Sequence, residues 1–190
     1  MLLRALAERQ YYLYRHSAGV AALARAVGGR LGLETVELRE VVDTAELHDV
    51  GKLALPDEIL EKPGALDDQE WKLMRQHTVV GERIVGALPA VADVGPLVRA
   101  SHERWDGRGY PDGLAGEEIP LASRIVFACD AFDAMTSNRF YGRPKTRTEA
   151  LGELEQCAGT QFDQRVVRAL VDELGSSGGP GREEAAMVGG

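Results

Sequence analysis

The spacing of apolar residues constrains the fold of this chain more than any other feature of its sequence. From His16 to Leu31 apolar side chains recur roughly at i, i+4 and i+7, and similar runs follow along the 190 residues. This is the spacing of one face of an α-helix, whereas the period-two alternation of half-buried strands is almost absent. The sequence therefore predicts an all-α domain built as a helical bundle.

Three segments differ in composition. Residues 1–14 are moderately apolar, and we expect a connector helix there. Residues 15–174 carry the helical pattern and are predicted to form one folded domain, which is long enough to bury a core. Residues 175–190 are rich in Gly and Ser, which predicts a disordered tail.

Helix ends are marked by capping residues and by glycine. Thr35 is a fair N-cap for a helix that Gly51 closes. Asp67, with Glu70 three residues later, has the form of a capping box and opens a single helix that continues to Ile84. The last two helices are expected near residues 148–158 and 163–174.

The segment from residue 106 to residue 120 is rich in turn-forming dipeptides but keeps three apolar side chains, Tyr110, Leu114 and Ile119. Apolar anchors within a turn-rich segment indicate a long ordered loop rather than a linker.

The chain has 22 basic and 30 acidic residues, a net charge of −8. This balance argues against binding polymeric nucleic acid over a broad surface, although a small phosphorylated ligand is compatible with a local basic cluster. Two cysteines give no disulfide framework and suit a reducing cytosol. No apolar run approaches the roughly 18 residues of a membrane span, and the N-terminus lacks a secretory signal. We expect a cytoplasmic protein without a membrane span.

All four histidines fall on, or at the end of, separate predicted helices: His16, His48, His77 and His102. One histidine among apolar residues is more often a satisfied core residue than a metal ligand, but four such positions favour a shared site. With Asp49 and Asp130 they make a mixed imidazole and carboxylate set. Such a set suits Fe(II) or Mn(II) better than Mg(II), and it lacks the thiolates of structural zinc.

The adjacent pair His48 and Asp49 is the centre of this set. The Asp49 carboxylate has two oxygens, so it can bind two cations, and two cations about 3.5–4 Å apart clamp the attacking and leaving oxygens at phosphorus. Lys52, three residues later, can direct a positive charge at a phosphate. Taken alone, the pair is better explained as a helix-ending histidine and a capping aspartate; the other three histidines favour the metal site.

Six motifs occur along the chain in a specific order. They are Arg15-His16-Ser17, His48-Asp49-Val50-Gly51-Lys52, His77-Thr78-Val79-Val80-Gly81, Ser101-His102-Glu103-Arg104-Trp105-Asp106-Gly107-Arg108-Gly109-Tyr110-Pro111, Asp130-Ala131-Phe132-Asp133-Ala134-Met135-Thr136 and Arg139-Phe140-Tyr141. With these motifs the chain resembles the HD-GYP family, the cyclic di-GMP phosphodiesterase branch of the HD superfamily, over roughly residues 12–174. The resemblance implies an HD-type helical bundle with a long ordered GYP loop. It also implies hydrolysis of cyclic di-GMP to the linear dinucleotide, with further cleavage to GMP left open.

The resemblance also implies individual roles. One metal ion would be held by His16, His48, Asp49 and Asp130, and Asp49 would bridge to a second ion held also by His77 and His102. Asp49 and Lys52 would be catalytic, and the substrate contacts would be Lys52, Tyr110 and Arg139.

Three of the predicted features have more than one interpretation. Asp133 either orients a ligand histidine or is a carboxylate on the helix surface. Arg139 opens a basic run with Arg143, Lys145 and Arg147, and for the last two we expect a solvated charge rather than a phosphate contact. The loop with Gly109-Tyr110-Pro111 shapes substrate access, presents a surface to diguanylate cyclase (GGDEF) domains, or only fixes a tight turn.

Four positions depart from the family pattern. Ser101 stands where members usually have a histidine, so one ligand to the second ion is missing. Tyr12 stands where some members have a glutamate that supports a third ion, so we expect two. Gly142 and Gly19 replace basic residues. These departures leave open a domain that binds a cyclic dinucleotide or a partner without turnover. A different nucleotide phosphohydrolase of the HD superfamily is the third hypothesis.

Overall fold

The computed structural model describes residues 11–137 and 143–176, with side chains from residue 15 onward. Within these ranges no strand forms, and two isolated β-bridges are present, so the all-α prediction is confirmed. The α-helices are α2 (Tyr11–Arg30), α3 (Thr35–Leu47), α4 (Asp57–Leu60), α5 (Asp68–Met74), α6 (Gln76–Gly86), α7 (Gly95–Arg99), α8 (Leu121–Thr136), α9 (Arg147–Gln156) and α10 (Gln164–Ser176). The short 3-10 helices are η1 (Val50–Ala54), η2 (Ala92–Val94), η3 (Ala100–His102) and η4 (Gly116–Glu118).

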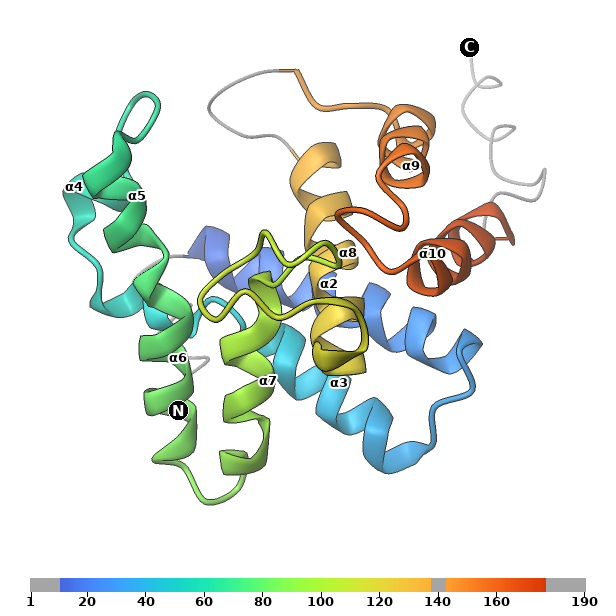
Figure 1. The fold of residues 1–190 in the computed structure, drawn as a ribbon, viewed down its shortest axis with the longest axis horizontal. Coiled ribbons are helices and arrows are strands. Elements are labelled where there is room, and N and C mark those ends of the chain that lie inside the picture. Colours follow the sequence, from blue (N-terminus) through green and yellow to red (C-terminus); the bar gives the residue numbers. More distant parts are fainter. Residues whose placement is uncertain (1–10, 138–142, 177–190) are drawn as a thin grey trace, which may run out of the picture.

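The helices pack around α8, which runs through the middle of the bundle (Figure 1). Helices α2 and α3 contact each other and α8, while α4, α5 and α6 lie on one side and α9 and α10 on the other. The main apolar core lies among α2, α3, α8, α9 and α10. Its fully buried side chains include Val20, Val41, Ile125, Leu154 and Val166.

A second, smaller apolar cluster lies between the end of α3, η1, α6 and α7. Leu47 and Val50, which belong to this cluster, flank the His48–Asp49 pair directly in the chain, whereas Ala45 belongs to the main core. The pair therefore lies where the two clusters meet. The other buried members of the second cluster are Val85, Val94 and Val98.

The second helix begins at Thr35 and ends beside the His48–Asp49 pair, as predicted, but its predicted N-cap is wrong. The N-cap of α3 is Glu34 rather than Thr35, and the Glu34 N–H donates to the Glu37 carboxylate at 2.9 Å. An acidic side chain in the first turn satisfies an otherwise unpaired N–H there. At the other end α3 stops at Leu47, well before Gly51, because the chain tightens into η1 and the Lys52 N–H donates to the Asp49 carbonyl.

The capping box at Asp67 is confirmed, but the single helix predicted to follow it is wrong. The helix breaks at Arg75 into α5 and α6. The carbonyl of Met74 accepts a hydrogen bond from His77 Nδ1 at 2.7 Å, and the carbonyl of Arg75 accepts one from Thr78 Oγ1 at 3.2 Å. At the break these two backbone carbonyls thus bond to side-chain groups, whereas in a continuous helix they would accept hydrogen bonds from backbone N–H groups.

Helix α2 is continuous across residue 14, the expected boundary between connector and domain. Helix α10 includes Gly175 and Ser176, which were expected in the tail, because Arg30 of α2 pairs with Glu173 and Ser176 in its last turn. Residues 1–10 and 177–190 lie outside the described residues, so the division into segments stays a prediction. None of the helices in the described ranges is both long and apolar enough to span a membrane.

Candidate metal centre

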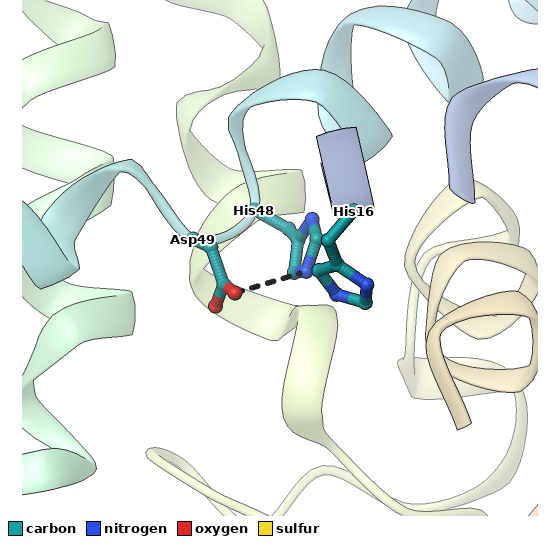
Figure 2. A group of neighbouring side chains, drawn as sticks. All are labelled: His16, His48 and Asp49. Carbon is teal, nitrogen blue, oxygen red and sulfur yellow. Dashed lines mark ion pairs between the residues drawn. The ribbon is translucent and has the colours of Figure 1, made fainter. Parts of the chain in front are cut away.

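The six predicted metal ligands come from distant parts of the chain and lie together in the bundle. Figure 2 shows His16 of α2 beside His48 and Asp49 at the end of α3. The remaining three come from α6, η3 and α8: His77, His102 and Asp130.

Gly51 allows the close approach of two of these elements. A Cβ atom at Gly51 would lie 1.9 Å from the carbonyl oxygen of His77, so any other residue would force η1 away from α6. Asp49 and His77 are therefore held near each other by backbone packing. The glycine marked in the sequence as a helix end serves in the structure as a contact point.

The ligand atoms form two groups that share Asp49. One atom from each of His16, His48 and Asp49 lies within 4.8 Å of the others, and so does one atom from each of Asp49, His77 and His102. The two carboxylate oxygens of Asp49 face different groups. Its Oδ2 lies 3.5 Å from His48 Nε2, and its Oδ1 lies 3.5 Å from His77 Nε2. This is the geometry that a bridging carboxylate requires.

Asp130 lies at the edge of the first group. Its Oδ1 is 2.9 Å from His16 Nε2 and 4.0 Å from His48 Nε2. The other ring nitrogen of His16, Nδ1, is 2.6 Å from Asp133 Oδ2. Asp133 therefore orients a histidine of the centre, which is the first of the two roles considered for it. Burial alone would lower the pKa of His16, but its hydrogen bonds to Asp130 and Asp133 outweigh burial and raise this pKa to about 9.

Two of the other histidines are oriented by the backbone. His48 Nδ1 lies 2.7 Å from the carbonyl of Ala45, and His77 Nδ1 lies 2.7 Å from the carbonyl of Met74. A carbonyl only accepts hydrogen bonds, so Nδ1 carries the proton in both rings. In the neutral form of each ring the lone pair is then on Nε2, which faces the centre. Fixing the tautomer by a bond to the distal nitrogen is typical of metal-binding histidines.

Unpaired buried atoms test whether these residues fit a metal ion. Of the six buried side-chain polar atoms that lack a partner in the described residues, four belong to this centre. Buried polar atoms are normally paired, so four unpaired ligand atoms converging on one place point to a cation as their partner. The donor set fits divalent metal ions. These four atoms are Asp49 Oδ1 and the Nε2 atoms of His48, His77 and His102.

Ser101 does not contribute to the second group. Its side chain is buried, and its hydroxyl donates to the carbonyl of Val98 at 2.8 Å. The second group therefore has three candidate ligands among the described residues, Asp49, His77 and His102. Burial and the neighbouring His77 lower the pKa of His102 to about 3, so its ring is neutral at physiological pH.

Lys52 lies beside the bridging carboxylate, with Nζ 2.7 Å from Asp49 Oδ2. Burial alone would raise the pKa of Asp49. The positive charge of Lys52 and the nearby histidines hold that pKa well below its usual range, so the carboxylate is ionised.

The loop after His102 covers the second group. The Tyr110 ring stacks on the His102 ring with their centroids 5.2 Å apart and their planes 11° apart. A Cβ atom at Gly109 would lie 2.3 Å from the Arg104 backbone nitrogen, so glycine is required there. The long ordered loop is confirmed, and the Asp106–Ala115 bridge closes it on itself. Arg139, the remaining predicted substrate contact, lies outside the described residues.

Glu103 is a structural residue of the site that the sequence named only as a motif member. Its buried carboxylate accepts hydrogen bonds from the backbone N–H groups of Asp112 and Gly113, at 2.7 and 3.0 Å. Arg99 binds the Asp112 carboxylate through two nitrogens. The sequence did contain a signal for this role: an acidic residue next to the predicted ligand histidine, followed by an Asp-Gly turn whose backbone N–H groups it could accept from.

A profile of the HD domain family matches residues 1–166. The chain belongs to the HD domain family. The HD-GYP prediction made from the ordered motifs is confirmed by the relatives. A cyclic di-GMP phosphodiesterase of Thermotoga maritima is 39% identical over 86% of this chain and 45% of its own length. A cyclic di-GMP phosphodiesterase response regulator of Xanthomonas campestris pv. campestris is 44% identical over 78% of this chain and 40% of its own length.

The same HD fold occurs in a crystal structure of a cyclic GMP-AMP specific phosphodiesterase of V. cholerae. The TM-score is 0.73 at 20% identity, over 92% of this chain and 47% of that one. At this identity the likeness shows the fold alone. The HD domain described here spans less than half the length of the curated relatives that it matches.

Proposed function

We propose that this HD domain is a metal-dependent phosphodiesterase that hydrolyses cyclic di-GMP to the linear dinucleotide, with GMP as the product of a second cleavage. The observation that carries the proposal is the convergence of unpaired buried ligand atoms on both sides of Asp49. The names of the relatives support the reaction class and the substrate.

The proposed centre holds two divalent ions. His16, His48, Asp49 and Asp130 bind the first, and Asp49, His77 and His102 bind the second. The imidazole and carboxylate donors support Fe(II) or Mn(II). When bound, such a pair of ions stabilises the attacking and leaving oxygens at phosphorus.

The other proposed roles belong to side chains around the ions. Lys52, next to Asp49, binds a phosphate oxygen of the substrate and offsets its charge, and Arg139 does the same from the basic run. Burial and the carboxylates of Asp49 and Asp130 raise the pKa of Tyr110 above its ordinary value. The Tyr110 hydroxyl therefore keeps its proton at neutral pH and donates a hydrogen bond to the substrate.

The proposal also covers the domain arrangement, the cellular compartment and a partner domain. Residues 15–174 form the catalytic domain, between a connector over 1–14 and a tail over 175–190. Free cysteines support a reducing, cytoplasmic setting. The ordered GYP loop is the proposed contact for a diguanylate cyclase (GGDEF) domain, and the exposed Arg108 on it supports a polar contact.

Ser101 favours a second candidate function, a domain that binds cyclic dinucleotides without turnover. With only three protein ligands the second ion is held less tightly, and loss of that ion would leave binding without cleavage.

Purification without oxygen, metal analysis, and reconstitution with Mn(II) or Fe(II) test both candidates, with cyclic di-GMP and cyclic GMP-AMP as competing substrates. The phosphodiesterase proposal expects close to two ions per chain and preferential cleavage of cyclic di-GMP. Tight binding of cyclic di-GMP without cleavage would favour the second candidate. Protein that resists reconstitution with either metal would exclude the dinuclear centre.

A further inference from the structure

Four planar side chains form a continuous column from the metal centre to the surface. The Tyr110 ring stacks on the ligand candidate His102. The guanidinium carbon of Arg75 lies 5.3 Å from the centroid of the Tyr110 ring and 6.0 Å from the centroid of the Trp71 ring. Each separation is within the range of aromatic stacking or of a cation–π contact. The outer end of the column, Trp71 and Arg75, is named the Trp71–Arg75 shelf below.

The shelf is exposed and is not explained by packing. Trp71 is 45% exposed, although indole rings are usually largely buried. In the described part of the chain, no carboxylate forms an ion pair with Arg75, whereas Arg99, Arg104 and Arg124 each pair with at least one. An exposed indole beside a guanidinium without an acidic partner, in a chain of net charge −8, is suited to binding a ligand.

The position of the shelf is linked to that of the metal centre. Arg75 is the residue at which α5 breaks from α6, and the His77 Nδ1 bond to the Met74 carbonyl helps to form this break. The same bond turns His77 Nε2 toward the centre. One local feature therefore places a metal-ligand candidate on one side and the shelf on the other.

We propose that Trp71 and Arg75 bind one nucleobase of the substrate by stacking, while the phosphodiester lies at the metal centre. This inference rests on the proposed phosphodiesterase function. A flat ring and a flat cation bind the face of a purine through stacking and cation–π attraction. Stacking accepts guanine and adenine alike, so the shelf provides affinity and does not choose between cyclic dinucleotides.

Hydrolysis of two substrates by the metal-loaded protein tests the shelf. Trp71→Ala and Arg75→Ala are each expected to lower kcat/KM for cyclic di-GMP about tenfold, mainly through KM, as for the loss of one base stack. Cleavage of methyl 4-nitrophenyl phosphate, a phosphodiester without a nucleobase, should not change. Trp71→Phe keeps a ring and should retain most of the affinity.

The matched control is Leu73→Ala, because Leu73 is 41% exposed on the same helix and lies outside the column. This variant should leave both substrates unaffected. An equal loss on both substrates in the shelf variants would indicate a structural effect on the centre and would overturn the inference. So would unchanged KM for cyclic di-GMP.

Fluorescence separates failure of the shelf from failure of the proposed function. The chain has two tryptophans, so a Trp105→Phe background leaves Trp71 as the only indole. A phosphorothioate analogue of cyclic di-GMP, which resists cleavage, should quench Trp71 saturably, and Arg75→Ala should weaken the titration about tenfold. If the protein cleaves the base-free diester but no cyclic dinucleotide, the proposed function is wrong. The quenching of Trp71 then still shows whether the Trp71–Arg75 shelf binds a nucleobase. Absence of quenching would refute the shelf whatever the hydrolysis result.

Discussion

The two halves of the metal centre share Asp49 but differ in their surroundings. In the first half, His16 lies between two carboxylates, Asp130 and Asp133, which raise its pKa to about 9. In the second half, His102 lies against the ring of Tyr110, and burial with the neighbouring His77 lowers its pKa to about 3. The first half therefore attracts positive charge more strongly than the second.

This difference bears on how each half holds a cation. The first group has carboxylate charge in excess and a histidine oriented by Asp133. The second has one shared carboxylate, two neutral imidazoles and the Ser101 hydroxyl turned toward the Val98 carbonyl. We therefore expect two ions of unequal affinity, the tighter one at His16, His48 and Asp130. Each prediction below alters the shared carboxylate, one half, or the loop over the second half.

The largest effect is expected from Asp49→Asn, which removes the charge that both halves share. Even changes of residues behind a metal ligand cost about 10–100-fold in metal affinity or activity, so loss of the bridging charge should lower turnover by more than about a hundredfold. Both ions should be lost in metal analysis while circular dichroism stays helical. Asp43→Asn, on the preceding helix α3, is the control. Retention of either ion at normal affinity would show that the halves are independent.

Asp133→Ala should weaken the first ion alone. It removes the acceptor that orients His16 Nδ1, and such partners contribute about 10–100-fold in metal affinity. Competition titration with a chelator would resolve two metal-binding steps, and only the dissociation constant of the tighter step should increase. Equal weakening of both steps would contradict the division of the centre into two halves.

Ser101→His should strengthen the second ion and raise turnover, because imidazole is a better ligand than a hydroxyl for these metals. The risk is steric, since Ser101 is buried. Ser101→Ala is the control, as it loses the bond to Val98 without adding a ligand. More metal without more turnover would favour the non-catalytic candidate function.

Glu103→Ala should destabilise the loop over the second half. The backbone N–H groups of Asp112 and Gly113 would lose their buried acceptor, at about 1–3 kcal/mol for an unsatisfied group. Urea denaturation should show the loss. Glu117→Ala, at an exposed pair with Arg165, should have almost no effect. A Glu103 variant as stable as wild type would show that the loop is held by other contacts.

The smallest effect is expected from Asp106, at the start of the same loop. Its hydrogen bond with Arg104 lowers its pKa from 3.8 to about 2, although burial slightly opposes this. A lowered pKa in the folded state stabilises the fold above pH 3.8, and the contribution disappears as the pH falls through about 2. Because the pair is near the surface, we expect less than about 1 kcal/mol. The stability difference between wild type and Asp106→Asn should be constant above about pH 5 and vanish in acid.

The sequence determined the helical fold and predicted which residues would make up the centre. The helical spacing of apolar residues does not depend on the details of packing. Histidines are few in the chain, so the types and order of all four, with Asp49 and Asp130, were enough to predict a shared metal site. Helix ends were less certain. Glu34 rather than Thr35 is the N-cap of α3, where it forms a capping box with Glu37.

Tertiary structure alone decided what each residue faces. The break at Arg75 arises from side chains bonding to carbonyls, and the contact at Gly51 depends on how η1 meets α6. The aspartates and histidines that shift the pKa values of His16 and His102 lie more than 20 residues away in the chain. Periodicity says which side of a helix is buried, not which group lies opposite. The unequal halves of the centre and the exposed Trp71–Arg75 shelf depend on those long-range contacts, so only the folded chain reveals them.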